Sequence, residues 1–536
     1  MTRLAAVREG LLRIRSLEGW RRYAVAFGFG CLAALAFAPL RFWPLLIIAF
    51  SGLALLTDSL MDHKKGRRAA FLTGSAFGFG YFGISCLWLA NAFLVQADAF
   101  AWMIPIVLPA FFLFLGLFFG FACLIHVATL KRFPRQGLVR IVPLLIGLTV
   151  AEWLRGHILT GLPWNLTSQA MASSAMLMQP LAALGPYGYG FVLTFLALMP
   201  AAGVLDQASA RRAGIAFATG ALIIVAYGSV RLLLHPTVLR DDAAVVVIQP
   251  NMAQRDKLDP QKRRQGLRDN LAATAAGANE FTGDESVYVV WPENAYPLLD
   301  RIPDLPDVLA QDLPADGYLI TGSIREVEEG YANALLAFGP AAEGSPLHTA
   351  YDKHRLVPFG ETLPFYEVFE ALGIASLSPV GGGGFIPGSG PRTVELGNAP
   401  FAPLICYEDV FPETLFPKNK RPDWMVVVTN DAWFGDAAGP RQHLDIARMR
   451  AIENGLPVVR SANTGISAII DPSGRMLQAL PLYQQNRFNF YLPAKIETPF
   501  YPQLKDVTLL LLLSVSAMLV LTRGAQHGID PGTRQQ

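Results

Sequence analysis

The chain has 536 residues, of which 52% are hydrophobic and only 16% are charged. Soluble globular proteins carry about 25% charged residues, so this composition excludes an ordinary soluble protein over the whole length. The formal net charge is only +2, and the basic residues gather beside apolar runs rather than in one patch, so we predict no nucleic-acid partner.

Apolar residues fill the chain up to about residue 235, thin out from 236 to 503, and return near 507. A membrane-spanning helix needs about 20 mainly apolar residues, so the pattern predicts a polytopic α-helical membrane domain of about eight spans. The fourth span is longer than a bilayer requires and contains Pro105 and Pro109, so we expect it to be tilted or kinked. The expected spans lie near residues 23–40, 43–58, 69–94, 101–130, 139–154, 186–204, 213–233 and 505–522.

The same pattern predicts three regions. Residues 1–235 form an N-terminal membrane domain, residues 236–503 a catalytic domain outside the cytoplasm, and residues 504–536 a last span with a cytoplasmic tail. Basic residues precede the first span and follow the second, fourth and sixth, whereas the other loops are nearly neutral. Because basic loops stay in the cytoplasm, both termini are expected there.

Short β-rich runs recur through residues 236–503, and several are continuously apolar, as in strands that are buried on both faces. Helices are predicted from Pro260 to Asn279 and from Pro440 to Asn454, the second with Gly455 just past its end. Strands alternating with helices indicate a layered α/β domain. The expected strands are Ala244–Ile248, Val287–Trp291, Tyr318–Thr321, Ala334–Phe338, Ala402–Ile405, Met425–Thr429, Val458–Arg460 and Ser467–Ile470.

A run of four glycines, Gly381 to Gly384, predicts a mobile loop in this domain, because glycine has the greatest backbone freedom. Phe385 and Ile386 follow it directly. We expect these two side chains to form an apolar tip that dips toward the bilayer and guards the way to the site.

Three polar residues of the α/β domain stand where chemistry is expected. Glu293 and Cys406 each follow an apolar run, and Lys353 lies between them in the chain. A carboxylate just past a buried strand suits a general base, a lysine can stabilise an oxyanion, and a thiol is a nucleophile. Each also has an ordinary alternative: a loop acid, a surface lysine or an inert buried cysteine.

Taken together, these residues and their neighbours resemble one family closely, over almost the whole chain. The order Glu, Lys, Cys is similar to that of the nitrilase superfamily, and the local motifs resemble its membrane-bound branch, the apolipoprotein N-acyltransferases. The motifs are Trp291-Pro292-Glu293, Lys353 with Val357-Pro358-Phe359-Gly360-Glu361, Cys406-Tyr407-Glu408, Asn430-Asp431-Ala432-Trp433-Phe434-Gly435, Gly439-Pro440, Gln442-His443 and Ala447-Arg448-Met449-Arg450-Ala451.

The resemblance implies a nitrilase-like αββα sandwich, set in a multi-pass protein of the bacterial inner membrane and facing the periplasm. It implies that an acyl chain passes from the sn-1 position of a phospholipid, typically phosphatidylethanolamine, to a thioester on Cys406. The chain then passes to the α-amine of the S-diacylglyceryl-cysteine of an apolipoprotein, which completes a triacylated lipoprotein.

The resemblance also implies residue roles. Glu293 acts as the base and Lys353 holds the oxyanion, so with Cys406 they form the catalytic set. Supporting or substrate-binding residues are expected at Asn333, Glu361, Phe385, Tyr407 and Glu408.

One position departs from the family pattern, because Leu258 stands where relatives often carry a tryptophan. Phe365, Phe385 or Trp433 would then supply apolar contact with substrate. A structural role is the alternative for Asp431, Trp433 and His443, and a lone His443 is more often a hydrogen-bonded helix residue than a ligand. No cluster has the spacing of a zinc site, so no metal is predicted, and no cofactor either.

Two other functions remain open from the sequence. A membrane-anchored nitrilase-type amidase or hydrolase would use the same three residues, with water resolving the thioester. A transporter or scaffold would draw support from Glu152 and Asn91, which are polar groups within or near spans.

Overall fold

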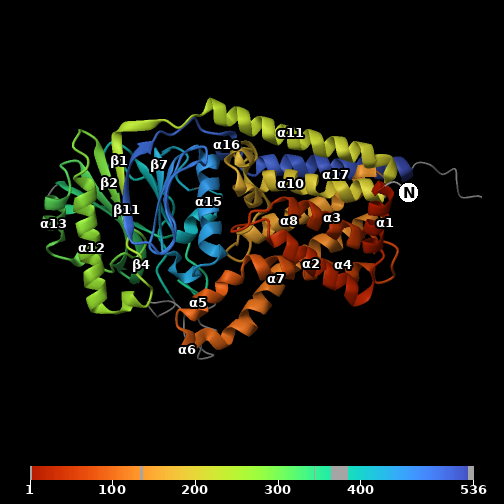
Figure 1. Ribbon diagram of the computed structural model, residues 1–536, viewed down its shortest axis with the longest axis horizontal. Helices are drawn as coiled ribbons and strands as arrows, with labels where there is room; N and C mark the ends of the chain where they lie inside the picture. The colour runs from red at the N-terminus through yellow and green to blue at the C-terminus, as the bar shows by residue number, and fades with distance from the viewer. Residues whose placement is uncertain (1–2, 133–136, 343–344, 364–383, 414, 529–536) are drawn as a thin grey trace, which may run out of the picture. The chain divides into compact units, whose positions relative to one another are not determined.

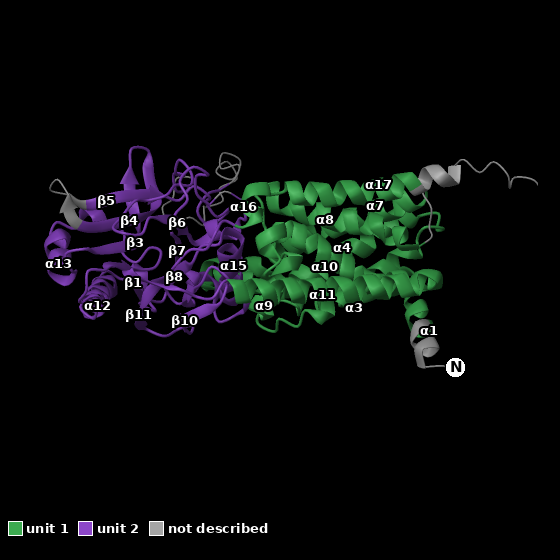
Figure 2. Cartoon of the chain, turned by 90° about the horizontal axis from the view of Figure 1, so that it is seen from above, with its two compact units in different colours: residues 1–234, 499–536 green, residues 235–498 purple. Residues whose placement is uncertain are grey.

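The computed structural model describes residues 3–132, 137–342, 345–363, 384–413 and 415–528. Two compact units emerge, one of residues 1–234 with 499–536 and one of residues 235–498 (Figure 2). We call them the helical unit and the sandwich unit. Gly381 to Gly383 and Phe365 lie outside the described residues.

The helical unit is built of helices throughout its described length (Figure 1). Short 3-10 turns connect several of them: η1 (Leu87–Leu89), η2 (Ala101–Met103), η3 (Gly137–Ile141), η4 (Thr167–Ser173) and η5 (Gln207–Ser209). The helices are α1 (Arg3–Arg15), α2 (Gly19–Ala34), α3 (Pro44–Asp58), α4 (Gly66–Ser85), α5 (Ala90–Leu94), α6 (Ala97–Phe100), α7 (Ile104–Leu130), α8 (Val142–His157), α9 (Ala175–Met178), α10 (Leu181–Leu205), α11 (Ala210–Leu234), α16 (Phe500–Leu504) and α17 (Val507–Gly528).

Helices stand at all eight predicted span positions. Among the described residues, four segments are long and apolar enough to cross a membrane: Ala97–Leu130, Gly137–His157, Leu181–Leu205 and Gln207–Leu234. A fifth arises if α4 and Leu87–Leu94 count as one span, although the two are bent by 56° at their junction. Helix α3 and the first part of α17 are apolar but shorter.

Two of the predicted spans are irregular in the structure. The third is not one straight helix, because α4 ends at Ser85 and the chain turns there. Helix α10 is kinked at Gly185, whose φ of +64° suits glycine. A Cβ at this position would lie 2.0 Å from the ring of Tyr501, so the close approach of that ring also requires glycine.

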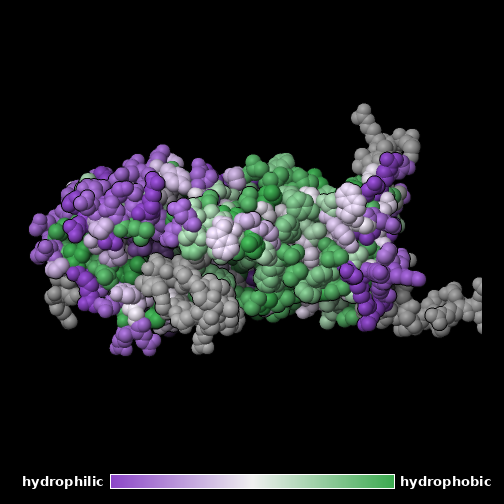
Figure 3. Space-filling model, turned by 90° about the horizontal axis from the view of Figure 1, so that it is seen from below, coloured by the Kyte–Doolittle hydropathy of each residue, from purple (hydrophilic) through white to green (hydrophobic). Residues whose placement is uncertain are grey.

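The helical unit exposes many large apolar side chains. Only 17% of the most apolar window of Gln207–Leu234 is buried. In water this surface would be unfavourable by about 25 cal/mol per Å², whereas lipid tails accommodate it. Figure 3 shows hydrophobic colour over most of the helical unit on the face in view, so we describe this unit as embedded in a membrane. Examples are Ile106, Leu113, Phe121, Leu222, Leu233, Leu510 and Met518.

The sandwich unit contains two β-sheets, one of six strands in the order β11-β1-β2-β3-β4-β5 and one of five in the order β10-β9-β8-β7-β6. Strands β1, β2 and β3 run parallel, as do β6, β7 and β8. The strands are β1 (Leu239–Gln249), β2 (Ser286–Val290), β3 (Gly317–Val327), β4 (Gly330–Ala342), β5 (Ser345–Asp352), β6 (Phe401–Ile405), β7 (Trp424–Thr429), β8 (Val458–Ala462), β9 (Ser467–Ile470), β10 (Met476–Leu480) and β11 (Asn486–Pro493).

Alternate residues of each central strand enter different cores, because side chains of a strand point to opposite faces. Val426 and Val428 of β7 face the core between the two sheets, whereas Met425 and Val427 face helix α15 (Ala438–Asn454). The first sheet has the same arrangement, with α12 (Pro260–Ala278) and α13 (Leu305–Asp312) on its outer face. Figure 1 shows α12 and α15 on opposite sides of the sheets, so the unit is the predicted αββα sandwich.

All eight predicted strands are present. Asp259 caps α12 by accepting from two backbone N–H groups, with Pro260 at the first position. Gly455 ends α15 with a φ of +63°, as predicted. The predicted start of α15 is wrong by two residues, because the helix begins at Ala438 and Pro440 is its third residue.

Candidate active site

The three candidate catalytic residues follow strands of the sandwich unit. Glu293 lies shortly after β2, Lys353 directly after β5, and Cys406 directly after β6. Glu293 and Lys353 are buried, with exposed fractions of 6% and 1%. The ends of these strands therefore place the Glu293 carboxylate and the Lys353 ammonium in the protein interior rather than in solvent.

Lys353 binds two carboxylates. Its Nζ lies 2.8 Å from Oε1 of Glu361 and 3.4 Å from Oε1 of Glu293. The Asn333 amide donates to the same two oxygens, at 2.7 Å and 2.8 Å respectively. The structure thus brings four of the predicted site residues into one hydrogen-bonded group. Lys353 and Asn333 are also joined through the backbone, since the N–H of Lys353 donates to the carbonyl of Asn333 at 2.8 Å.

Local packing holds both carboxylates in place. Gly322 of β3 lies against the backbone of Glu293, and a Cβ at this position would come within 2.4 Å of the Glu293 Cα. Glu361 is fixed by its second oxygen, Oε2, which accepts from the N–H of Val357 at 2.8 Å. Rotation of either carboxylate therefore breaks several contacts at once.

Cys406 occupies a strained turn between β6 and the 3-10 helix η8 (Cys406–Val410), with a φ of +49°. The buried Glu408 carboxylate supports this turn by accepting from the N–H of Ile405 at 2.8 Å. It also accepts from the N–H of His354 at 2.8 Å and from the hydroxyl of Tyr351 at 3.0 Å. Glu408 thus ties the turn of the thiol to the segment that carries Lys353.

Burial and the neighbouring charges shift the pKa values of Cys406 and Lys353, and these effects partly oppose one another. Burial raises the pKa of the Cys406 thiol well above its ordinary value, and Glu293 raises it further, whereas Lys353 lowers it. Burial alone would lower the pKa of Lys353, but the carboxylates of Glu361 and Glu293 raise it above its ordinary value. Lys353 therefore stays a cation, and burial together with the Glu293 charge favours the protonated form of the Cys406 thiol.

The remaining predicted site residues lie less centrally. Tyr407 is half-buried, and its ring packs edge-on against Phe411 with centroids 5.1 Å apart. Trp433 is half-buried, and Leu258 has an exposed fraction of 73%.

The prediction that Phe385 forms an exposed apolar tip is wrong. Phe385 has an exposed fraction of only 6%, and its N–H donates to the carbonyl of Glu361 at 2.8 Å. The N–H of Ile386 donates to the carbonyl of Tyr331 at the same distance. These backbone bonds fasten the segment along the edge of the site, so Phe385 packs inward.

Sequence reasoning missed Lys257, which lies on the 3-10 helix η6 (Asp256–Leu258). Its Nζ donates to the carbonyl of Asn294 at 2.9 Å, next to Glu293. Burial lowers the pKa of Lys257 to about 8, although the Glu293 carboxylate acts to raise it. The signal in the sequence is its position next to Leu258, the residue that departs from the family pattern.

No group of His, Cys, Asp and Glu side chains among the described residues could hold a metal ion.

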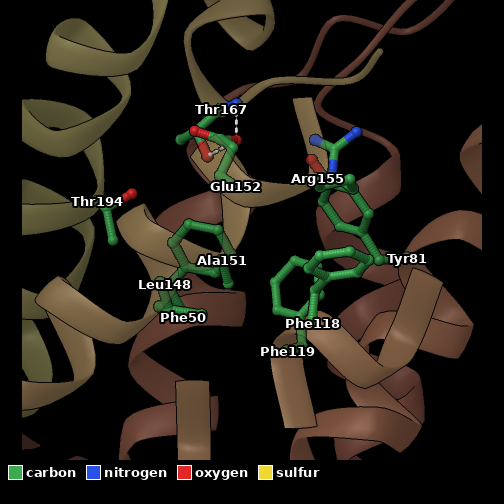
Figure 4. Close-up of a pocket in the computed structure, with 10 residues that line it drawn as sticks. All are labelled: Phe50, Tyr81, Phe118, Phe119, Leu148, Ala151, Glu152, Arg155, Thr167 and Thr194. Atoms are coloured by element: carbon green, nitrogen blue, oxygen red, sulfur yellow. Dashed lines mark hydrogen bonds between the residues drawn. The ribbon is translucent and has the colours of Figure 1, made fainter. Parts of the chain in front are cut away.

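Glu152, the residue that gave support to the transporter alternative, is hydrogen-bonded within the helical unit. Its Oε1 accepts from the N–H and the hydroxyl of Thr167, at 2.7 Å and 2.9 Å (Figure 4). Arg155, one turn further along α8, donates to the carbonyl of Trp164 at 2.7 Å. Both charged groups therefore fasten α8 to the segment that follows it.

Comparison with known proteins matches both units. Residues 29–199 match the apolipoprotein N-acyltransferase N-terminal domain, and residues 245–486 match the carbon-nitrogen hydrolase family. An apolipoprotein N-acyltransferase of Rhodopseudomonas palustris is 38% identical, over 95% of this chain and 96% of its own length. That of Bradyrhizobium diazoefficiens is 38% identical over 98% and 99%, and that of Allorhizobium ampelinum 37% over 93% and 94%.

The chain belongs to the apolipoprotein N-acyltransferase family. It is an acyltransferase with a membrane-embedded helical unit and a sandwich unit of the nitrilase superfamily. We refer to it below as the enzyme.

Proposed function

We propose that the enzyme transfers an acyl chain from the sn-1 position of a phospholipid to the α-amine of a diacylated apolipoprotein. The transfer passes through a thioester on Cys406. The observation that carries this proposal is the buried Lys353, held between Glu293 and Glu361 beside the strained turn of the thiol. A buried ion pair of this kind next to a nucleophile is typical of a catalytic site.

In the first half-reaction Glu293 takes the thiol proton, and the sulfur attacks the ester carbonyl. The negative charge that develops on the carbonyl oxygen is stabilised by the Lys353 ammonium. The carbon–oxygen bond of the ester then breaks, and Glu293 returns the proton to the departing alkoxide. A lysophospholipid leaves, and the acyl chain remains bound to sulfur.

In the second half-reaction the lipoprotein amine attacks the thioester. Glu293 removes a proton from the amine while Lys353 again stabilises the oxyanion. The carbon–sulfur bond breaks, and the thiolate regains the proton from Glu293. One base and one cation therefore serve both halves, and no other reactant is consumed.

The supporting residues act through these three. Glu361 and Asn333 hold Lys353 and Glu293 at fixed distances, and Glu408 holds the turn of Cys406. We assign Tyr407, which is half-buried beside the thiol, to contact with substrate. Phe385 is assigned to packing behind Glu361, whose carbonyl its N–H binds.

The test is intact-mass analysis of the enzyme after incubation with phosphatidylethanolamine. One acyl adduct should appear on the parent protein and on the control Cys31→Ala, which lacks a thiol of the helical unit. Cys406→Ala should show no adduct and no lipoprotein N-acylation while keeping its fold. Normal N-acylation by Cys406→Ala would disprove the assignment.

The amidase or hydrolase alternative differs in the second half-reaction, where water would resolve the thioester. The products separate the two, because a hydrolase releases free fatty acid, whereas the proposed transferase yields N-acylated lipoprotein. Fatty acid release that is unaffected by added lipoprotein would favour the hydrolase.

The sandwich unit is assigned to the periplasmic side of the bacterial inner membrane. The support is the alternation of basic and neutral loops along the spans. A reporter fused at the exposed Gly283 should be active only outside the cytoplasm, and one fused at the C-terminus only inside. A cytoplasmic signal from the Gly283 fusion would refute this orientation.

A further inference from the structure

Four buried charged residues gather behind the turn of Cys406. They are Asp409, Asp431, His443 and Arg460, with exposed fractions of 0 or 1%. Each comes from a different element: η8, the 3-10 helix η9 (Asp431–Phe434), α15 and β8. None of them belongs to the group around Lys353.

The four side chains close a ring of contacts. Nε2 of His443 lies 2.8 Å from Oδ1 of Asp409, and its Nδ1 lies 3.0 Å from Oδ1 of Asp431. Arg460 donates from Nη2 to Oδ2 of Asp431 at 2.7 Å, and its Nη1 lies 3.6 Å from Oδ2 of Asp409. Each carboxylate therefore meets both the imidazole and the guanidinium.

The ring is neutral only if His443 carries a proton on both nitrogens. A neutral imidazole donates from one nitrogen, yet here both nitrogens face a carboxylate oxygen. The positive charge of Arg460 disfavours a second proton on His443, because its Nη2 lies 3.0 Å from Nδ1 of His443. Burial also lowers the pKa of His443, but Asp409 and Asp431 together raise it to about 9. The result is two cations against two anions.

Two routes connect this ring to the thiol. Asp409 lies on η8, the same short turn that begins at Cys406. The hydroxyl of Thr429 lies between the ring and the thiol, because it donates to Oδ1 of Asp431 at 3.1 Å and interacts with the Cys406 sulfur. Asp431 itself acts on the thiol, since its charge contributes to the raised pKa of Cys406.

We propose that Asp409, Asp431, His443 and Arg460 are positioning residues for the nucleophile, which fix its turn and balance the charge behind the sulfur. The inference rests on the proposed role of Cys406. Without the His443 cation, the ring would hold one carboxylate in excess, and that charge would disfavour the thiolate. The two cations therefore allow carboxylates to hold the turn without a net negative charge behind the sulfur.

The test is the pH dependence of Cys406 alkylation by iodoacetamide, in a Cys31→Ala background and with the full chain in detergent. His443→Gln leaves a net charge of −1 in the ring. It should raise the apparent pKa of the thiol by about one unit, which makes alkylation about tenfold slower well below that pKa. Adding Asp409→Asn removes the excess charge and should restore the parent titration.

The double variant separates charge balance from packing. A purely structural role for His443 predicts that the second substitution worsens the defect, because it removes one more buried contact. Such a result, or a normal thiol titration in folded His443→Gln, would overturn the proposal.

If His443→Gln does not fold, Asp431→Asn tests the proposed charge balance instead. It removes the carboxylate next to Thr429 and should lower the apparent pKa of the thiol, so an unchanged or raised value would overturn the proposal. These measurements do not depend on acyl transfer. Failure of the nucleophile assignment would appear instead as N-acylation by Cys406→Ala, with the alkylation results unaffected.

Discussion

The helical and sandwich units each contain a glutamate near the end of an apolar element, half-buried Glu152 in the first and buried Glu293 in the second, but the two carboxylates have different partners. Glu152 of α8 accepts from the backbone and the hydroxyl of Thr167, which are neutral donors. Glu293, after β2, accepts from the Asn333 amide and lies 3.4 Å from the Lys353 ammonium. Hydrogen bonds from neutral donors fasten the chain at Glu152, whereas a direct hydrogen bond to an ammonium group, as at Glu293, is typical of a site that can move protons.

The same contrast extends to the basic groups. In the helical unit Arg155 donates hydrogen bonds to backbone carbonyls, such as that of Trp164. In the sandwich unit Lys353 and Arg460 each face carboxylates. Buried charge alone therefore does not distinguish the proposed site from the rest of the enzyme; an ion pair close to the proposed nucleophile does.

The largest expected difference is between Glu293→Gln and its matched control Glu152→Gln. Both replace a carboxylate by an amide of nearly the same size. Loss of a general base costs about 10²–10⁴ in rate, so Glu293→Gln should form acyl-enzyme at least 100-fold more slowly. Single-turnover intact-mass measurements would follow the adduct on Cys406.

Glu152→Gln should form the adduct at a rate close to that of the parent, because its partners at Thr167 can still donate to an amide oxygen. An equal loss of acylation rate in both variants would show that the two carboxylates do not differ in function. Normal acylation by Glu293→Gln would contradict its role as the base.

A somewhat smaller loss is expected for Lys353→Ala. Removing one oxyanion-stabilising group typically costs about 10²–10³ in rate, and here the loss should appear in both thioester formation and its resolution. Lys262→Ala is the control, since Lys262 is an exposed lysine paired with Asp256 at 2.6 Å. A Lys353→Ala defect confined to one half-reaction would show that the ammonium does not serve both oxyanions.

The smallest effect is expected for Lys257→Met, and it should depend on pH. With its pKa lowered to about 8, Lys257 loses its proton as the pH rises through that value. Below that pH, the Lys257 cation attracts the Glu293 carboxylate. The variant lacks this charge, so below pH 8 it should acylate more slowly than the parent, by less than about tenfold, and it should show no step in rate near pH 8. A pH profile identical to that of the parent would exclude an effect of Lys257 on the reaction.

The fold was largely predictable, and the strands that were missed share a position. Strands β5 and β11 are the two edges of the first sheet, and β10 is an edge of the second. Edge strands are only partly covered, so their sequences lack the continuous apolar run that reveals a central strand. Strand β6 is also an edge, yet both of its faces are buried, and it was found.

The site was predictable only in part. Resemblance to a family brought Glu293, Lys353 and Cys406 together, and Glu361 and Asn333 with them, but it gave no distances. The positive φ of Cys406 arises from tertiary packing and leaves no mark in the sequence. Arg460 lay inside a predicted strand and His443 inside a predicted helix, so neither suggested that the two meet across Asp431.

The pairing of β1 with β11 has a mechanical consequence. The chain enters the sandwich unit at β1 and leaves it after β11, and these strands pair antiparallel, with Leu239 opposite Pro493. The backbone bond from Ala494 to Val238 extends the pair beyond its end. A force that pulls on the chain before β1 and after β11 would break the backbone hydrogen bonds between these two strands one after another rather than all at once. We expect β11 to peel from the sheet edge at low force while the other strands stay paired.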